Sequence, residues 1–279
     1  MARICIDQFY DWKKQGHRWV CLTAYDAPTA RVLESASVPM ILVGDSLGNV
    51  ILGHDSTVPV TMDDMVRHSA AVRRGAENTF VVCDMPFLAA QISDEDAIRN
   101  AGRLIQEGMA DAVKIEGGGA RVGTIRRIVD AGIPTMGHLG LTPQNATQLG
   151  GYKVQGNTPA SAAQILKDAR AIEESGAFAL VLECVPTGLA EKIQGALSIP
   201  VIGIGAGLSV DAQVLVFHDL VGLSGGFKPR FVRRYADVEQ VMKTAVEGFL
   251  ADVSSGDFPG ERESFVSKDG ESAEMAPGA

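Results

Sequence analysis

Eight short apolar runs alternate with longer amphipathic segments along most of this chain. Most of the runs are nearly continuous in apolar residues, which is typical of parallel strands covered on both faces. The alternation therefore predicts an α/β fold, a single-domain (β/α)8 barrel, and 279 residues suffice because such a barrel needs about 250. The predicted strands are Trp19–Thr23, Met40–Gly44, Thr79–Asp84, Ala112–Glu116, Pro134–His138, Phe178–Glu183, Pro200–Ile204 and Val214–His218.

Capping signals mark several of the intervening helices. Thr61 followed by Asp64 matches a capping box. Thr158 before Pro159 predicts an N-cap with proline at the first helical position. Residues 6–16 predict an extra helix before the first strand, which is placed to plug the N-terminal end of the barrel.

The chain shows no second domain, linker or short-period repeat. We expect residues 1–258 to form the barrel catalytic domain. Residues 259–279 are rich in Gly, Ser, Glu and Pro and carry no apolar period, so we expect a disordered tail.

Charge and cysteine content exclude several classes of protein. The net charge of −9 and the lack of a basic stripe argue against a nucleic-acid partner. No run of 18 apolar residues predicts a membrane span. The four cysteines are scattered without a CxxC pair, which favours a reducing compartment, and we expect a cytoplasmic protein.

Acidic side chains stand at the ends of several predicted strands, where barrels form their active sites. Asp45 follows strand two, and Asp84, Glu116 and Glu183 end strands three, four and six. His138 ends strand five at a height where it could face a substrate, although a packing role is equally open.

The alternation of strand side chains sharpens this pattern. If Val113 and Ile115 face the helices, Lys114 and Glu116 point into the barrel. A lysine inside a barrel needs a partner, so Lys114 either pairs with Glu116 or holds a substrate carboxylate.

Four carboxylates in one low-dielectric site would repel one another without a cation. Oxygen ligands without a Cys/His cluster favour Mg²⁺ or Mn²⁺ over zinc. Such a metal can chelate an α-keto acid and acidify the carbon beside the ketone, and a free carboxylate can then act as general base. The plainer interpretation is that each acid caps a helix or pairs with a cation.

Several ordered strings resemble ketopantoate hydroxymethyltransferases, from about residue 5 to about residue 265. The most distinctive are Leu22-Thr23-Ala24-Tyr25-Asp26, Val43-Gly44-Asp45-Ser46-Leu47-Gly48, Asp84-Met85-Pro86-Phe87, Val113-Lys114-Ile115-Glu116-Gly117-Gly118, Gly137-His138-Leu139-Gly140-Leu141-Thr142-Pro143-Gln144, Gly150-Gly151-Tyr152-Lys153-Val154-Gln155-Gly156 and Leu182-Glu183-Cys184-Val185-Pro186.

The resemblance implies a (β/α)8 barrel that transfers a hydroxymethyl group from 5,10-methylenetetrahydrofolate to 3-methyl-2-oxobutanoate through an enolate stabilised by Mg²⁺. The product would be 2-dehydropantoate, a precursor of pantothenate and coenzyme A. The family is homo-oligomeric, commonly a decamer of two pentameric rings. The implied roles are a metal site, a substrate site and a base: metal ligands Asp45, Asp84 and Glu116; substrate contacts Asp45, Ser46, Asp84 and Lys114, to which we add His138; general base Glu183.

The sequence departs from the family pattern at Asp211-Ala212-Gln213, where the family usually has Asp-Gly-Gln, and in the tail beyond Glu263. Three alternatives stay open. A Mg²⁺-dependent lyase or mutase of the phosphoenolpyruvate mutase type would need a Lys-Lys-Cys-Gly-His string, which is missing. A phosphate-binding isomerase using the Gly203–Gly207 loop would have little use for four acids. A non-catalytic barrel binding protein would have lost a ligand or the base.

Overall fold

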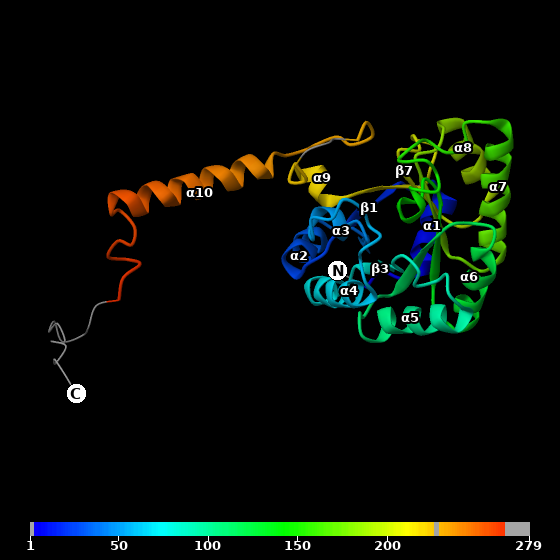
Figure 1. The fold of residues 1–279 in the computed structure, drawn as a ribbon, viewed down its shortest axis with the longest axis horizontal. Coiled ribbons are helices and arrows are strands. Elements are labelled where there is room, and N and C mark those ends of the chain that lie inside the picture. The colour runs from blue at the N-terminus through cyan, green and yellow to red at the C-terminus, as the bar shows by residue number, and fades with distance from the viewer. Residues whose placement is uncertain (1–2, 226–228, 266–279) are drawn as a thin grey trace.

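The computed structural model describes residues 3–225 and 229–265, in which eight parallel strands close into a barrel in chain order (Figure 1). The barrel closes where β1 pairs with β8, with Trp19 opposite Ala212. This confirms the predicted (β/α)8 barrel. The strands are β1 (Trp19–Thr23), β2 (Met40–Val43), β3 (Phe80–Asp84), β4 (Ala112–Glu116), β5 (Thr135–Gly140), β6 (Ala179–Glu183), β7 (Val201–Ile204) and β8 (Ala212–Leu215).

Most helices cover the outside of the barrel, and two of them begin at the predicted caps Thr61 and Thr158. The Thr61 hydroxyl accepts a hydrogen bond from the Asp64 amide, and the Asp64 carboxylate accepts one from the Thr61 amide, as a capping box requires. The helices are α1 (Ile6–Gln15), α2 (Ala27–Ser35), α3 (Leu47–Val50), α4 (Met62–Gly75), α5 (Asp94–Gln106), α6 (Arg121–Asp130), the 3-10 turn η1 (Pro143–Asn145), α7 (Pro159–Glu174), α8 (Thr187–Ala196), α9 (Phe217–Val221) and α10 (Val238–Ser255). No helix of the described residues is long and apolar enough to cross a membrane.

Strand side chains alternate between two separate apolar clusters, as the sequence predicts. Val113 and Ile115 belong to the outer cluster between strands and helices. Val82, Ala112 and Val181 belong to the inner cluster, which fills the N-terminal half of the barrel. The inward positions that follow on the same strands are charged, so the interior changes from apolar to polar toward the C-terminal ends.

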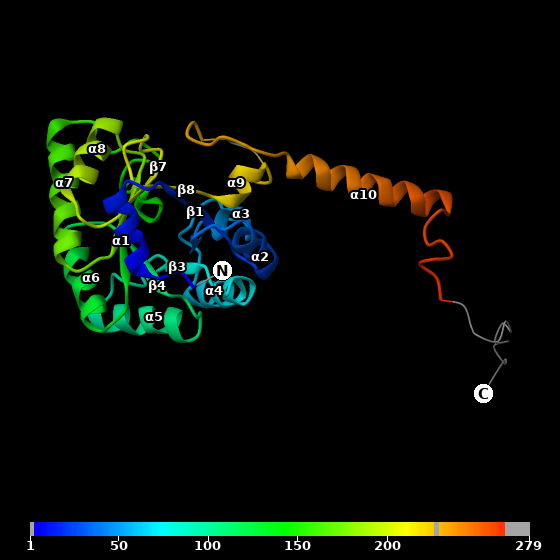
Figure 2. The same cartoon turned by 180° about the vertical axis from the view of Figure 1, so that it is seen from behind.

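The N-terminal helix α1 closes the apolar end of the barrel. Phe9 is fully buried, and its ring lies 4.7 Å from the Trp19 ring and 5.4 Å from the Phe80 ring, measured between centroids. Figure 2 shows α1 lying across the barrel strands. The predicted plug is therefore present, and it supports the strands from below the charged layer.

The last strand begins two residues earlier and ends three residues earlier than the sequence predicted. β8 spans Ala212–Leu215, whereas His218 of the predicted strand belongs to α9. Gln213 faces outward and is exposed, and this polar residue interrupts the apolar run that marks the other strands. The departure from the family pattern at Ala212 thus lies on a strand and not in a loop, with its methyl group inside the barrel.

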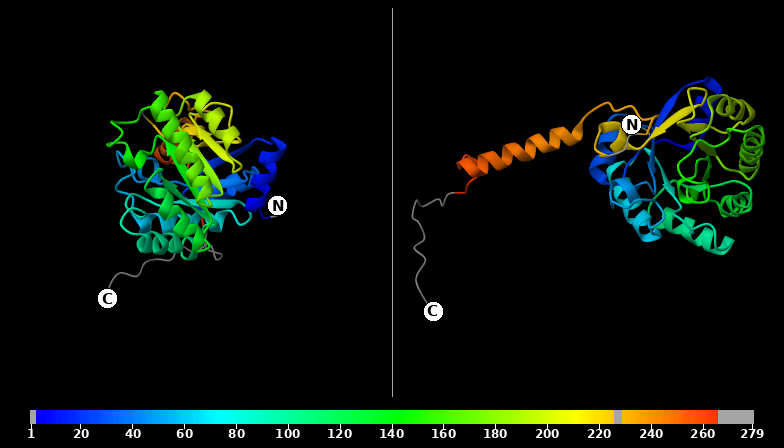
Figure 3. Two further views of the ribbon diagram at one scale, coloured as in Figure 1. Left: turned by 90° about the vertical axis from the view of Figure 1, so that its right-hand side faces the viewer. Right: turned by 45° about the horizontal axis from the view of Figure 1, so that its top comes forward.

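Helix α10 projects away from the barrel (Figure 1 and the right-hand view of Figure 3). None of its residues is buried, although it carries apolar side chains. On the barrel, the outward-facing Val20 of β1 is 45% exposed, and Gln213 of β8 beside it is exposed as well.

The predicted tail begins with turns at residues 259–265, and its remainder lies outside the described residues.

Candidate active site

A cavity of about 150 Å³ opens at the C-terminal ends of the strands. All seven candidate residues of the sequence line it, although they come from four different strands and the segment after a fifth. They are Asp45, Ser46, Asp84, Lys114, Glu116, His138 and Glu183. Active sites of barrel enzymes form at this end, so the structure brings the predicted residues together where chemistry is expected.

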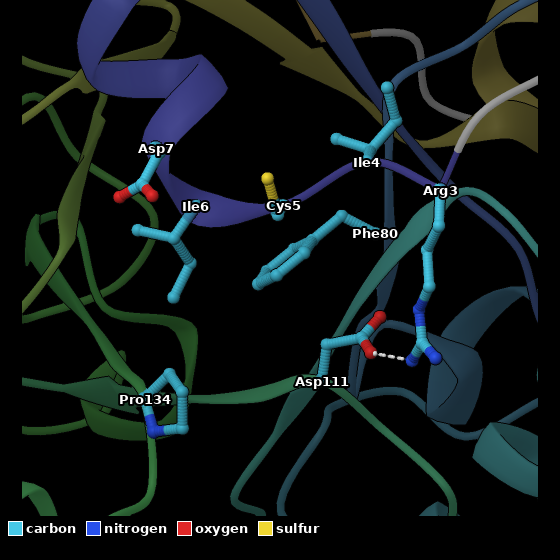
Figure 4. Close-up of a pocket in the computed structure, with 8 residues that line it drawn as sticks. All are labelled: Arg3, Ile4, Cys5, Ile6, Asp7, Phe80, Asp111 and Pro134. Carbon is cyan, nitrogen blue, oxygen red and sulfur yellow. Dashed lines mark hydrogen bonds and ion pairs between the residues drawn. The ribbon is translucent and has the colours of Figure 1, made fainter.

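A hollow at the opposite end of the barrel lacks such a constellation (Figure 4). There Asp111 is paired with Arg3 at 2.8 Å and also with Arg73, so its charge is already satisfied. Residues at this end of a barrel generally serve stability. We therefore assign the candidate active site to the cavity at the strand C-termini.

The strand register places the charged groups next to one another. Asp84 is the register partner of Lys114, and Glu116 is the partner of His138. Lys114 Nζ lies 3.1 Å from Asp84 Oδ1 and 3.2 Å from His138 Nδ1. The predicted alternative pairing of Lys114 with Glu116 is thus replaced by an ion pair with Asp84.

His138 lies between two carboxylates. Its Nδ1 is 3.3 Å from Glu116 Oε1, and its Nε2 is 3.3 Å from Glu183 Oε2. Burial and the Lys114 ammonium lower the pKa of His138, but the adjacent Glu116 and Glu183 carboxylates outweigh them and raise it to about 9. The ring is therefore an imidazolium at neutral pH, with both nitrogens available to donate.

Gly140 allows β5 to approach β6 beside the candidate base. It has a φ of +93°, and a Cβ there would lie 2.1 Å from the Glu183 carbonyl oxygen. A side chain would push the two strands apart, so this close approach requires glycine. The chain can then turn directly into η1 above the cavity.

The buried acids are only partly neutralised by their cationic neighbours. Burial, Glu116 and Asp84 raise the pKa of Asp45 well above its usual range. Burial also raises the pKa of Asp84, against the opposing effect of the Lys114 ammonium. The pKa of Glu116 is lowered, because the His138 imidazolium and Lys114 outweigh its burial. The cavity retains excess negative charge, which a bound cation would relieve.

The carboxylate oxygens of the cavity suit a hard divalent cation. Their present positions, however, do not form a complete coordination shell. Among residues 3–225 and 229–265, no three acidic, His or Cys side chains converge closely enough to hold a metal as they stand. Buried Asp84 Oδ1 accepts no well-directed hydrogen bond, even with the Lys114 ammonium nearby. Carboxylate oxygen atoms are the ligands that Mg²⁺ and Mn²⁺ prefer, so the chemistry of the donor set fits such an ion.

Two further groups at this end were not singled out by sequence reasoning. Gln144 on η1 is 4% exposed, and its side-chain amide donates to Asp45. Tyr152 lines the cavity while remaining 61% exposed. Both belong to strings that carry the family resemblance, which was the available signal, but neither stands at a strand end.

Comparisons with known proteins agree on one family. The family model described as ketopantoate hydroxymethyltransferase matches residues 3–261. The 3-methyl-2-oxobutanoate hydroxymethyltransferase of Heliobacterium modesticaldum is 53% identical over 94% of this chain and 95% of its own length. That of Moorella thermoacetica is 53% identical over 95% of this chain and 98% of its own length.

Solved structures show the same barrel at much lower sequence identity. A phosphonopyruvate hydrolase in complex with oxalate and Mg²⁺ is similar with a TM-score of 0.63 at 12% identity, covering 94% of this chain and 93% of that one. A 2,3-dimethylmalate lyase of the phosphoenolpyruvate mutase/isocitrate lyase superfamily matches with a TM-score of 0.58 at 16% identity, over 98% and 91% of the two chains. At these identities the likeness concerns the fold alone.

Proposed function

Because the chain belongs to the ketopantoate hydroxymethyltransferase family and is therefore a one-carbon transferase, we propose that it converts 3-methyl-2-oxobutanoate to 2-dehydropantoate with 5,10-methylenetetrahydrofolate as donor. A carbon–carbon bond forms between C3 of the ketoacid and the methylene carbon, water supplies the hydroxyl oxygen, and tetrahydrofolate leaves. This reaction is a step toward pantothenate and coenzyme A. The observation that carries the proposal is the set of four carboxylates, a lysine and an imidazolium around one cavity.

Asp45, Asp84 and Glu116 are the residues that would hold one Mg²⁺ per subunit. When bound, the cation polarises the keto group of the substrate and acidifies the neighbouring C–H. The Lys114 ammonium is buried beside Asp84 and is the cation available for the substrate carboxylate. Ser46 lines the same cavity, and its hydroxyl shares a 2.8 Å hydrogen bond with the Tyr25 hydroxyl, so it can orient a substrate oxygen.

Glu183 is the proposed general base that removes the proton from C3. It is the one acid of the four that is not assigned to the metal, and it lies at the cavity wall on β6. His138 Nε2 lies 3.3 Å from Glu183 Oε2, where it can hold the carboxylate in place for proton removal. His138 therefore has two contacts in this proposal: it lines the substrate cavity, and it touches the base Glu183.

The same chemistry weighs against the other candidates. The support for a lyase or mutase of the phosphoenolpyruvate mutase type is a fold shared at 12–16% identity. The relatives that are 53% identical carry the transferase name instead. A non-catalytic barrel would leave the four acids of the cavity without a use. We also propose a cytoplasmic location, because all four cysteines are free thiols.

A direct assay tests the function. Purified protein is incubated with 3-methyl-2-oxobutanoate and 5,10-methylenetetrahydrofolate, with Mg²⁺ or with a chelator, and 2-dehydropantoate is measured by mass spectrometry. We expect product with Mg²⁺ and its loss with the chelator, restored when the metal is added back. Phosphonopyruvate and 2,3-dimethylmalate serve as comparison substrates, and turnover of either in place of transfer would refute the proposal.

A further inference from the structure

Gln144 is a buried neutral side chain that contacts the carboxylate cluster. It lies on η1 after β5 and is 4% exposed. Its side-chain Nε2 donates to Asp45 Oδ2 at 2.8 Å and to the Met85 carbonyl at 2.9 Å. Its main-chain amide donates to Glu116 Oε2 at 3.1 Å. One residue therefore joins the ends of β2, β3, β4 and β5.

The orientation of the Gln144 amide follows from its partners. A carboxylate oxygen and a carbonyl oxygen both accept hydrogen bonds, so the group facing them must be the NH₂ and not the oxygen. Each of its two hydrogens then has one acceptor. The Met85 carbonyl anchors the amide to the main chain next to Asp84, and the second hydrogen fixes the rotation of the Asp45 carboxylate.

The neighbouring acids are held by other donors. Asp84 is bound by the Asp45 main-chain amide at 3.1 Å and by the Lys114 ammonium. Glu116 has the His138 ring as well as the Gln144 main-chain amide. Among the described residues, Gln144 is the only side chain that donates to the Asp45 carboxylate, which leaves Asp45 Oδ1 without a protein donor. Asp45 thus depends on Gln144 more than the other acids do.

We propose that Gln144 is a positioning residue, which uses one oxygen of Asp45 to aim the other at the divalent cation. This inference rests on the proposed function, since it assumes that Asp45 is a metal ligand. A neutral amide suits the task because it donates without adding a charge to the cluster. Partners that orient a metal ligand in this way typically contribute about 10- to 100-fold to metal affinity.

The test is Mg²⁺ affinity measured by calorimetry on chelator-treated protein without substrates. Gln144→Met keeps the length of the side chain but removes the donor, and the main-chain hydrogen bond to Glu116 remains available. We expect affinity to fall about 10- to 100-fold. Gln144→Asn keeps the amide but shortens the side chain, so it should lose a similar factor. Melting temperatures in chelator establish that both variants are folded at the temperature of the titration.

The matched control is Asn145→Leu in the same turn. Asn145 donates to Thr142 Oγ1 at 3.3 Å and makes no hydrogen bond to the acids, so this change disturbs η1 alone. Its Mg²⁺ affinity should equal that of the wild type. If either folded Gln144 variant binds Mg²⁺ as the wild type does, or if Asn145→Leu loses as much affinity, the positioning role is refuted. If the wild type itself binds no divalent cation, the proposed metal site fails instead.

Discussion

Lys114 and His138 are the basic side chains that line the cavity, and each is buried between acids. Burial disfavours both charges, yet the surrounding carboxylates hold them protonated. Removing either one would leave an acid without compensation in a low-dielectric site. The cations are thus as necessary to the site as the acids are.

The raised pKa of His138 predicts a pH dependence of stability for the metal-free protein. A folded pKa of about 9, above the ordinary 6.5, means that the native state holds an extra proton between these values. Stability from His138 is full below pH 6.5 and is lost as pH rises through about 9, at a slope of about 1.4 kcal/mol per pH unit.

Urea denaturation in chelator across this pH range measures the slope. His138→Gln, which cannot titrate, should flatten the curve. NMR of the imidazole nitrogens gives the pKa directly, and a value at or below 6.5 would show that the ring is neutral and that Glu183 lacks its proposed cationic partner.

Helix α1 and the strand ends form two layers with separate tasks. The α1 plug buries Phe9 against the rings of Trp19 and Phe80, and this apolar layer supports the charged layer above it. Loops that carry a site are positioned accurately only when the scaffold below them is rigid. The plug therefore contributes to function through stability.

Phe9→Ala should lower the free energy of unfolding by about 3–5 kcal/mol, because it leaves a cavity in the barrel interior. Lys14→Ala on the exposed side of the same helix is the control, and it should change stability by less than about 0.5 kcal/mol. Equal effects of the two changes in urea denaturation would mean that α1 is not a structural plug.

Sequence reasoning succeeded where the strand period alone determines the outcome. Alternation is sufficient to turn Lys114 and Glu116 inward, because Val113 and Ile115 face the helices. The register that sets Asp84 beside Lys114 was not predicted. It failed at β8, where exposed Gln213 breaks the apolar run. Gln144 could not be predicted, because its contact with Asp45 spans 99 residues and depends on the turn after Gly140.

At the scale of the whole molecule, α10 stands out because none of its residues is buried within the described part of the chain, although Phe249 contacts Phe258. Its exposed apolar side chains recur at helical spacing and form one stripe: Met242, Val246, Phe249, Leu250 and Val253. The segment before α10 contacts α9, since the Tyr235 amide donates to the Leu220 carbonyl at 2.8 Å. We propose that the stripe packs on a second copy of the chain, in the homo-oligomer that the resemblance implies.

Light scattering on purified protein should give a mass above that of one subunit, and ten subunits if the family's decamer applies. Leu250→Asp places a charge in the stripe and should lower the mass, because Leu250 is 59% exposed in the single subunit and would be buried in the assembly. Thr244→Ala, on the opposite face of the helix, should leave the mass unchanged. A monomeric wild type would contradict this role for α10.

Hydrogen–deuterium exchange at C3 of 3-methyl-2-oxobutanoate, followed by proton NMR in D₂O without folate, isolates proton removal from one-carbon transfer. With Mg²⁺ the wild type should exchange this proton and collapse the methyl doublet to a singlet. Chelator should abolish the exchange, and Glu183→Gln should slow it at least about 100-fold while ketoacid binding persists. Exchange by Glu183→Gln at the wild-type rate would contradict the account, because Glu183 would then not be the base.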